Sequence, residues 1–287
     1  MSQTAKKIPA QHQDKMPANE YEMTPAPDYK PRFAGVGKLK DKVAFIAGGD
    51  SGIGRAVSIL FAREGAKIAI AYLEEDKDAQ ETKRIIEEEE NGEVILIEGD
   101  LSDNDHAKKA IEETVKTYGG LNIVVNNGAM QYMDEDFENF DADKLRQTVD
   151  NNIYSYMFVT QAALPHLKEG DSIINTSSVN AFAGMGSLIT YSTTKGANLA
   201  FSRSLAENLA EKGIRVNAVA PGPIWTPFIP GTMPAEKVED FGSDMVPLGR
   251  CGQPWEVATA YLFLASSDGN YYTGQTLHPN GGMVVGA

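Results

Sequence analysis

From Leu39 onward, short apolar runs alternate with longer segments of helical periodicity, and this alternation restricts the possible folds most strongly. The runs are VAFIA (43–47), KIAIAY (67–72), VILIE (94–98), NIVVN (122–126), SIINT (172–176), IRVNAVA (214–220) and QTLHP (275–279). Most are continuous, as in strands that helices cover on both faces. Helices are predicted near 53–64, 76–90, 103–117, 143–168, 191–212 and 254–265, with Ser102 capping the third. The pattern predicts an α/β fold, a doubly wound sheet of about seven mostly parallel strands.

The first predicted strand runs into a glycine-rich stretch, AGGDSGIG, at residues 47–54. Glycine spacing alone is a weak signal, and a plain turn would explain it. The alternative is a phosphate cradle, in which bare backbone lets a pyrophosphate approach the N-terminus of the helix that begins near Ile53. The alternation predicts one such Rossmann-type domain over residues 39–287, with no internal boundary.

Residues 1–38 differ from the rest of the chain. They hold Pro9, Pro17, Pro25, Pro27 and Pro31, five of its 14 prolines, and have no helical or strand periodicity. We expect an extended arm rather than a domain. Tyr21, Met23, Tyr29 and Phe33 could anchor it on the main body or on a neighbouring subunit; a loose tail is the alternative.

Composition excludes several kinds of protein. The formal net charge of −14 argues against a general affinity for nucleic acid or anionic lipid. The single cysteine, Cys251, allows no intrachain disulfide and fits a cytoplasmic location; it is a buried residue more readily than a catalytic thiol. The four histidines lack metal-ligand spacing, so no metal is predicted. No apolar run is long enough to span a membrane, and no signal peptide is evident at the N-terminus.

In doubly wound folds, ligands bind beyond the carboxyl ends of the strands. Several distinctive residues directly follow predicted strands and are therefore candidates for a site. They are the glycine loop, Asp100, the turn Asn126–Gly128, Ser177 with Ser178, and Pro221 with Gly222.

Tyr191 and Lys195, in YSTTK, are four residues apart and share one face of a predicted helix. A nearby ammonium favours the phenolate. Lowering the pKa of a tyrosine by roughly three units takes about 4 kcal/mol, which requires partial desolvation and further positive charge. A surface pair is the plain alternative. Ser178 follows a strand and lies at the ligand end, where its hydroxyl could bind a substrate oxygen or, more simply, cap a turn.

Together these motifs resemble the short-chain dehydrogenase/reductase family. Its Thr-Gly-x-x-x-Gly-x-Gly motif matches 47–54, with Ala47 in place of threonine, and its Asn-Asn-Ala-Gly turn is similar to NNGA at 126–129. Its adenine-side Asp matches Asp100, and its Pro-Gly turn matches PGPIWT at 221–226. Its four active-site residues match Asn152, Ser178, Tyr191 and Lys195.

The resemblance implies an NAD(P)-dependent oxidoreductase that interconverts an alcohol and a carbonyl by hydride transfer. Tyr191 would be the general acid/base, Lys195 would lower its pKa and hold the nicotinamide ribose, and Ser178 would polarise the substrate oxygen. Asn152 would support Lys195 through a water. The cofactor would contact Gly48, Asp50, Ser51, Gly52, Ile53, Gly54, Tyr72, Leu73, Asp100, Leu101, Asn127, Gly128, Tyr191, Lys195, Pro221, Gly222, Ile224 and Thr226.

The choice between NAD and NADP depends on the end of the second strand. An acidic residue there would bind the ribose 2′-hydroxyl of NAD, and a basic one the 2′-phosphate of NADP. The aligned positions hold Tyr72 and Leu73, and Ser51 is also not basic. Glu74 and Glu75 would repel a phosphate unless they point into solvent, so NAD is predicted and NADP is the alternative.

Substrate binding is assigned to the Pro- and Gly-rich segment 223–253. Its Trp225, Phe228, Ile229 and Met233, with Gln131, Asn180 and Phe182, are expected to line a pocket or to form core or subunit contacts. The resemblance implies a homo-oligomer, a tetramer by preference, with the arm and MVVGA (283–287) as contact elements. The proline-rich arm also resembles the N-terminal extension of a subgroup of this family linked to sugar, polyol or aldehyde substrates and to stress responses. A regulatory module that binds dinucleotide without turnover, and an assembly protein acting through its arm, are the alternatives.

Overall fold

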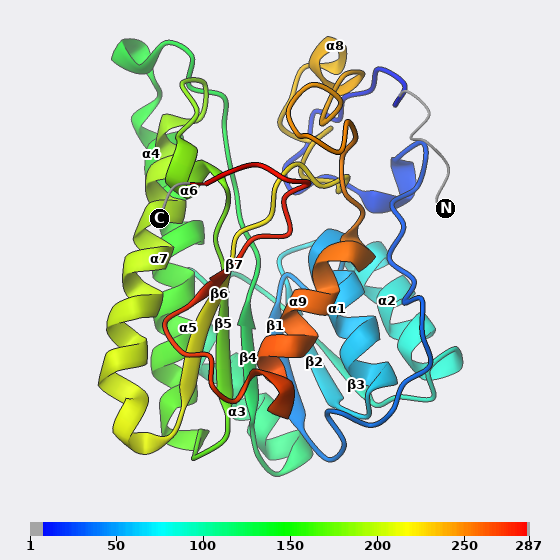
Figure 1. The fold of residues 1–287 in the computed structure, drawn as a ribbon, viewed down its shortest axis with the longest axis vertical. Coiled ribbons are helices and arrows are strands. Elements are labelled where there is room, and N and C mark those ends of the chain that lie inside the picture. Colours follow the sequence, from blue (N-terminus) through cyan, green and yellow to red (C-terminus); the bar gives the residue numbers. More distant parts are fainter. Residues whose placement is uncertain (1–7, 286–287) are drawn as a thin grey trace.

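The computed structural model describes residues 8–285. A single sheet of seven parallel strands runs through the chain in the order β3-β2-β1-β4-β5-β6-β7. Helices cover both of its faces, so the predicted doubly wound α/β fold is confirmed (Figure 1). The strands are β1 (Val43–Ala47), β2 (Lys67–Tyr72), β3 (Val94–Glu98), β4 (Ile123–Asn126), β5 (Ser172–Thr176), β6 (Arg215–Val219) and β7 (Thr276–Leu277).

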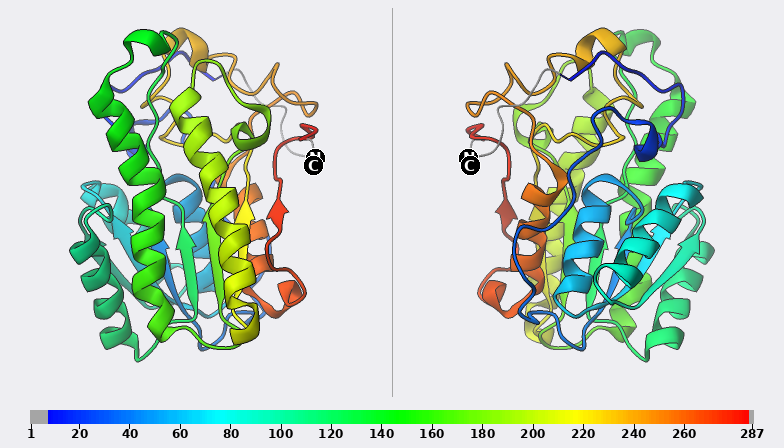
Figure 2. Two further views of the ribbon diagram at one scale, coloured as in Figure 1. Left: turned by 90° about the vertical axis from the view of Figure 1, so that its left-hand side faces the viewer. Right: turned by 90° about the vertical axis from the view of Figure 1, so that its right-hand side faces the viewer.

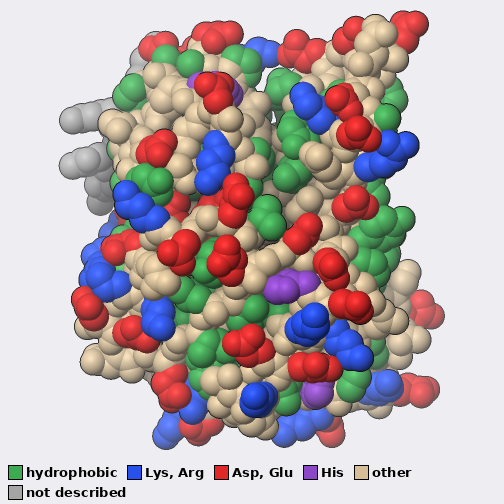
Figure 3. All heavy atoms as spheres, turned by 180° about the vertical axis from the view of Figure 1, so that it is seen from behind, with side chains coloured by type: hydrophobic (Ala, Val, Ile, Leu, Met, Phe, Trp, Pro, Cys, Tyr) green, Lys and Arg blue, Asp and Glu red, His purple; other side chains and the backbone are tan. Residues whose placement is uncertain are grey.

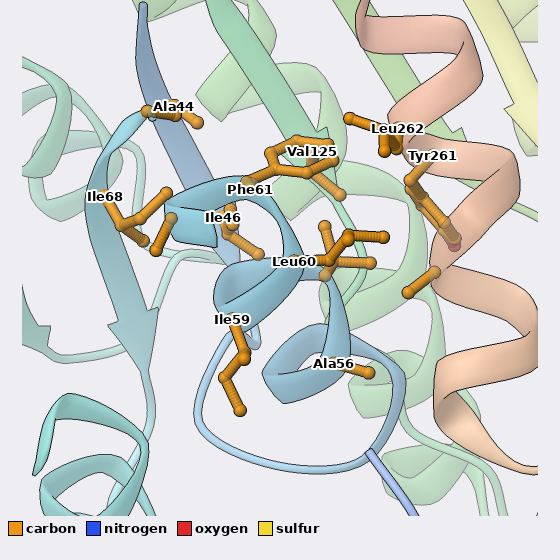
Figure 4. Packing of buried hydrophobic residues seen from close by; sticks show 14 of the residues in the cluster. Ala44, Ile46, Ala56, Ile59, Leu60, Phe61, Ile68, Val125, Tyr261 and Leu262 are labelled. Carbon is orange, nitrogen blue, oxygen red and sulfur yellow. The ribbon is translucent and has the colours of Figure 1, made fainter. Parts of the chain in front are cut away.

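Two hydrophobic clusters follow from the continuous apolar strands. On one face, β1 and β2 pack on the helices α1, α2 and α9; Phe61, Leu60 and Tyr261 meet there beside Ile46 and Val125 (Figure 4). On the other face, the strands pack on α3, α5 and α7. The helices are α1 (Gly52–Arg63), α2 (Asp76–Glu88), α3 (Asn104–Tyr118), α4 (Ala142–Val149), α5 (Ser155–Ala163), α6 (Asn180–Ala183), α7 (Ile189–Leu209), α8 (Ala235–Val238) and α9 (Pro254–Ala265). Short 3-10 turns occur at Glu20–Glu22, Phe137–Asn139, Leu164–His166, Ala210–Lys212 and Ser267–Gly269.

Two local predictions differ from the structure. The cap of α3 is Asp103, whose carboxylate accepts from the N–H groups of Asp105 and His106; the prediction of Ser102 was wrong by one residue. The helix predicted over 143–168 is interrupted by a π-helical turn at Asp150–Tyr154, between α4 and α5. A π-turn leaves no mark on hydrophobic periodicity in so short a segment.

The described part of the N-terminal segment, residues 8–38, has one 3-10 turn and no strand, and it lies against the main body (Figure 2). Of its expected anchors, Met23 is buried, and Tyr29 packs against the hydrophobic cluster between the sheet and the helices α1, α2 and α9. Tyr21 and Phe33 remain largely exposed. Despite the negative net charge, acidic and basic side chains are interspersed over the face shown in Figure 3.

Candidate active site

The glycine loop between β1 and α1 needs its glycines for two reasons. Gly48 and Gly52 have φ values of 69° and 53°, in the left-handed region that favours glycine. Gly54 has an ordinary φ, but a Cβ there would lie 1.7 Å from the carbonyl oxygen of Gly48. Only a bare backbone therefore allows the loop to fold back onto the first turn of α1, which leaves a cradle of main-chain atoms at the helix N-terminus.

This cradle is one end of a pocket of about 290 Å³ beyond the carboxyl ends of the strands. Most of the residues predicted to bind cofactor line it. They are Gly48, Asp50, Ser51, Gly52, Ile53, Tyr72, Leu73, Asp100, Leu101, Asn127, Gly128, Tyr191, Lys195, Pro221, Gly222, Ile224 and Thr226. Gly54 does not line it, since it packs beneath the loop against Gly48.

Ser178 and Tyr191 meet in the pocket from different elements. Ser178 follows β5, and Tyr191 lies in the first turn of α7. Burial raises the pKa of Tyr191 to about 12, and a hydrogen bond with the Ser178 hydroxyl opposes that rise. The phenol is therefore protonated at neutral pH, and its hydroxyl lies beside that of Ser178 in the pocket.

Lys195 lies one turn along α7 from Tyr191 and is fully buried. Its Nζ donates to the carbonyl oxygen of Thr176 at 3.0 Å and to the hydroxyl of Tyr156 at 3.4 Å. Burial lowers the pKa of Lys195 to about 7. The expected depression of the pKa of Tyr191 by this amine is not found among the protein groups; desolvation dominates both residues.

Asn152 lies behind the pocket, in the π-helical turn, and does not line it. Its side-chain amide binds both main-chain polar groups of Met130: Oδ1 accepts from the Met130 N–H and Nδ2 donates to the Met130 carbonyl, both at 2.8 Å. Nδ2 also donates to Thr194 on α7, at 3.0 Å. Asn152 thus joins the pocket wall after β4 to the helix that carries Tyr191 and Lys195.

The end of β2 presents one carboxylate to the pocket. Glu75 is 5% exposed, lines the pocket, and has a buried Oε1 atom with no protein hydrogen-bond partner. Burial, and then the charge of Asp50, raise the pKa of Glu75. Glu74 instead faces solvent and lies 3.7 Å from Lys15. Of the two glutamates weighed from the sequence, one faces the pocket and the other does not.

The opposite end of the pocket is mainly apolar. Of the expected substrate residues, Gln131, Asn180, Phe228, Ile229 and Met233 line it. Phe241 and Met245 of the segment 223–253 also line the pocket. Sequence reasoning missed four others, because no periodicity links them: Met130, Met133, Met185 and Leu188.

Two of the expected substrate residues do not line the pocket. Trp225 is fully buried and donates its Nε1–H to the carbonyl of Pro25. It belongs to a third hydrophobic cluster, here called the satellite cluster, which is formed by Ile8, Met23, Trp225, Ile229, Val238, Phe241 and Cys251. Phe182 packs edge-on against His278. For both, the alternative reading as structural contacts was the correct one. Cys251 is likewise buried in the satellite cluster.

The sequence also gave no sign that the N-terminal segment reaches the site. Met16, Pro17 and Ala18 line the same pocket as the glycine loop.

Within residues 8–285, no group of three or more His, Cys, Asp or Glu side chains is arranged to hold a metal ion. None of the helices over this range is long and apolar enough to cross a membrane.

Comparisons with known proteins agree with this geometry. Residues 47–284 match the family model described as enoyl-(acyl carrier protein) reductase. The chain is 51% identical over 266 residues to NADPH-dependent aldehyde reductase 1 of Arabidopsis thaliana, covering 91% of each chain. It is 47% identical over 264 residues to glucose and ribitol dehydrogenase of Daucus carota, covering 90% of this chain and 89% of the relative. A short-chain dehydrogenase from Burkholderia cenocepacia J2315, solved in complex with NADP, matches with a TM-score of 0.80 and 28% identity, over 85% of this chain and 98% of that one.

Proposed function

This chain belongs to the short-chain dehydrogenases/reductases, oxidoreductases that use NAD(P), and we propose that it reduces a carbonyl through Ser178, Tyr191 and Lys195. The observation that carries the proposal is the convergence of the Ser178 hydroxyl and the Tyr191 phenol in one pocket with the glycine cradle. A pocket for binding alone needs no such pair.

The cradle and the pocket suit a dinucleotide. Two positive-φ glycines and the close approach of Gly54 to Gly48 leave room for a pyrophosphate at the N-terminus of α1. When bound, the cofactor supplies or accepts the hydride. We assign the pyrophosphate and adenosine contacts to the loop 48–54, the end of β2, and Asp100 with Leu101; the remaining predicted residues face the nicotinamide half, with Thr226 beside Gly52.

The protein's own groups handle the proton and the substrate oxygen. Ser178 hydrogen-bonds that oxygen and orients it, and Tyr191 donates the proton as the oxygen gains charge. Lys195 would hold the ribose hydroxyls and, when protonated, would stabilise the resulting phenolate. Asn152 is assigned the support of this arrangement, because its amide links the Met130 main chain to Thr194 on α7. A water between Asn152 and Lys195 would complete the path of the proton.

NAD is proposed as the main cofactor. The unpartnered carboxylate oxygen of Glu75 is an acceptor for a ribose 2′-hydroxyl and would repel a 2′-phosphate. The NADP in the Burkholderia protein and the NADPH in the name of the Arabidopsis relative point the other way. We propose that Glu75 favours NAD in this chain. A titration of the same protein with both cofactors compares their affinities directly.

Among aldehydes, sugars and polyols, an aldehyde with an apolar substituent suits the pocket best. Methionine and aromatic side chains are prominent in the part of the lining assigned to the substrate, including Met185, Met233 and Phe228, beside polar residues such as Gln131 and Asn180. A sugar needs a hydrogen-bonding partner for most of its hydroxyls, and an unpaired one is costly when buried. A cytoplasmic homo-oligomer, with a tetramer preferred, completes the proposal; the last two residues of MVVGA lie outside the described residues.

The test is a substrate screen with matched variants. Purified protein is incubated with NADH or NADPH and a panel of aliphatic aldehydes, aromatic aldehydes and aldoses, and cofactor oxidation is followed. Turnover of aldehydes by the wild type, with loss of turnover in Tyr191→Phe, supports the proposal. Binding without turnover of any carbonyl or alcohol would favour the regulatory module instead.

A further inference from the structure

The N-terminal segment forms part of the wall of the cofactor pocket. Met16, Pro17 and Ala18 line the pocket together with Tyr72 and Glu75, at the end of β2. Because β2 lies beside β1 and its glycine loop, this is the end assigned to the adenosine half of the dinucleotide. The segment precedes the first strand by more than twenty residues, so its place here is a tertiary contact and not a consequence of local chain connectivity.

Glu20 fastens this segment to the glycine loop. The carboxylate is 3% exposed, and its Oε2 accepts from the N–H of Gly52, the first residue of α1, at 2.5 Å. Its Oε1 accepts from Arg55. The backbone N–H of Glu20 donates to Asp78 of α2 at 2.8 Å. One residue of the segment therefore contacts the cradle, α1 and α2 at once.

Arg55 extends the contact into the loop itself. Its Nε donates to the carbonyl of Asp50 at 3.0 Å and to the hydroxyl of Thr82 at 2.7 Å. Thr82 in turn donates to the same Asp50 carbonyl at 2.6 Å. The guanidinium also pairs with Asp78 at 3.1 Å, so these buried side chains hold the loop backbone on both sides of Ser51.

The same segment is attached to the other side of the pocket. Ala18 packs so closely on Gly231 that a Cβ on that glycine would lie 2.7 Å from its own. The N–H of Gln13 donates to the carbonyl of Pro230 at 2.9 Å, and Trp225 donates to Pro25 at 2.8 Å. The segment thus bridges the glycine loop and the substrate segment 223–253.

We propose that the N-terminal segment is a working part of the cofactor site: Met16–Ala18 wall its adenosine end, and Glu20 is a positioning residue that holds the glycine loop. The inference rests on the proposed function for the location of the dinucleotide. Glu20 takes up the N–H of Gly52, and the N–H of Ile53, which lines the pocket in the same first turn, is left to serve the pyrophosphate. The single positive charge of Arg55 is shared between the carboxylates of Glu20 and Asp78, so it offsets part of the negative charge that Glu20 brings to the loop.

The experiment measures dissociation constants directly, by the fluorescence of NADH and NADPH, with no substrate present. The test variant is Glu20→Ala, and Glu22→Ala is its matched control, since Glu22 is exposed and accepts from Asn19 of the same segment. Removing a partner from a buried charged hydrogen bond should raise the dissociation constant about tenfold. Glu22→Ala should stay within about twofold of the wild type. A dissociation constant for Glu20→Ala within about twofold of the wild type would overturn the proposal.

If Glu20→Ala does not fold, hydrogen exchange on the wild-type protein decides. The amides of residues 18–23 should exchange more slowly once the cofactor binds, because the cofactor packs against the segment. Unchanged exchange in a saturated complex would overturn the proposal while leaving the proposed function intact. Failure of the wild type to bind either dinucleotide would instead remove the proposed function, and this inference with it.

Discussion

The Nζ of Lys195 lies 5.6 Å from the centre of the Tyr191 ring, one turn of α7 away, and within residues 8–285 no carboxylate forms a salt bridge with it. Burial moves the two residues in opposite directions: the pKa of the amine falls to about 7 and that of the phenol rises to about 12. Both shifts favour the neutral forms. The site therefore contains two groups whose charged forms are unfavourable where they lie. The hydrogen bond with Ser178 acts against the rise in the pKa of the Tyr191 phenol.

Tyr191→Phe removes the proton donor and little else. Turnover should fall by about 10²–10⁴-fold, the usual contribution of a general acid or base. Cofactor affinity should change by less than about threefold, because the ring and its contact with Phe228 remain. Steady-state kinetics and NADH titration of the same preparation measure the two effects. Retention of full activity would exclude the phenol as the proton donor.

Lys195→Met should stabilise the protein while it abolishes turnover. The unfolded chain keeps the lysine protonated up to a pKa near 10.5, whereas the folded one releases the proton near 7. Between these values the unfolded state binds more protons, so the free energy of unfolding rises with pH, and at pH 7 the wild type lacks that stability. The difference corresponds to roughly 4 kcal/mol, reduced by loss of the hydrogen bond to Thr176.

Urea unfolding of Lys195→Met and wild type at several pH values measures this effect. The advantage of the variant should be largest at pH 7 and below, and should shrink as the pH rises toward 10.5. An advantage that is absent at pH 7, or that grows with pH, would contradict the assignment of a desolvated amine.

Gly54→Ala should disable the cradle. The new Cβ would lie 1.7 Å from the Gly48 oxygen, so the loop must move, and cofactor binding should be lost along with more than about 1 kcal/mol of stability. Gly196→Ala is the matched control: it lies within α7, meets nothing within 4 Å, and should gain up to about 1 kcal/mol. Equal behaviour of the two variants would show that the close approach has no consequence.

Glu75→Gln tests the cofactor preference. Removing the charge while keeping an acceptor should lower discrimination against NADPH, by about tenfold in the ratio of dissociation constants, since a nearby carboxylate repels the 2′-phosphate. Glu74→Gln, at the exposed neighbouring position, should leave the ratio unchanged. An identical ratio in Glu75→Gln and wild type would place the specificity elsewhere.

The features that follow from short-range patterns could be predicted. Continuous apolar strands and intervening amphipathic helices predict the parallel, doubly wound sheet, although not its strand order. Residues at strand ends such as Ser178 and Asn127 lie in the pocket because parallel strands end at one edge. What depends on tertiary contacts could not. Nothing in the sequence predicts the hydrogen bond between Glu20 and Gly52. Trp225 was expected in the pocket, and only the structure shows that its indole N–H donates to the carbonyl of Pro25.

The pKa of Tyr191 shows the same boundary between local and tertiary effects. The spacing of Tyr191 and Lys195 correctly places both on α7, and from this spacing alone we expected a lowered pKa of the Tyr191 phenol. The direction of the shift depends on how completely the pocket desolvates each group, and this is set by packing from several distant segments. Desolvation exceeds the effect of the amine at this distance.

The most direct test of the central claim is a fluorescence titration of the wild-type protein with NADH and with NADPH. We predict saturable binding of both, with NADH the tighter because the proposed contact of Glu75 with the ribose 2′-hydroxyl would repel the 2′-phosphate of NADPH. Tighter NADPH binding would keep the oxidoreductase and reject the role of Glu75. If a folded sample bound neither dinucleotide, the glycine cradle would have no cofactor to hold, and the proposed reaction would be wrong.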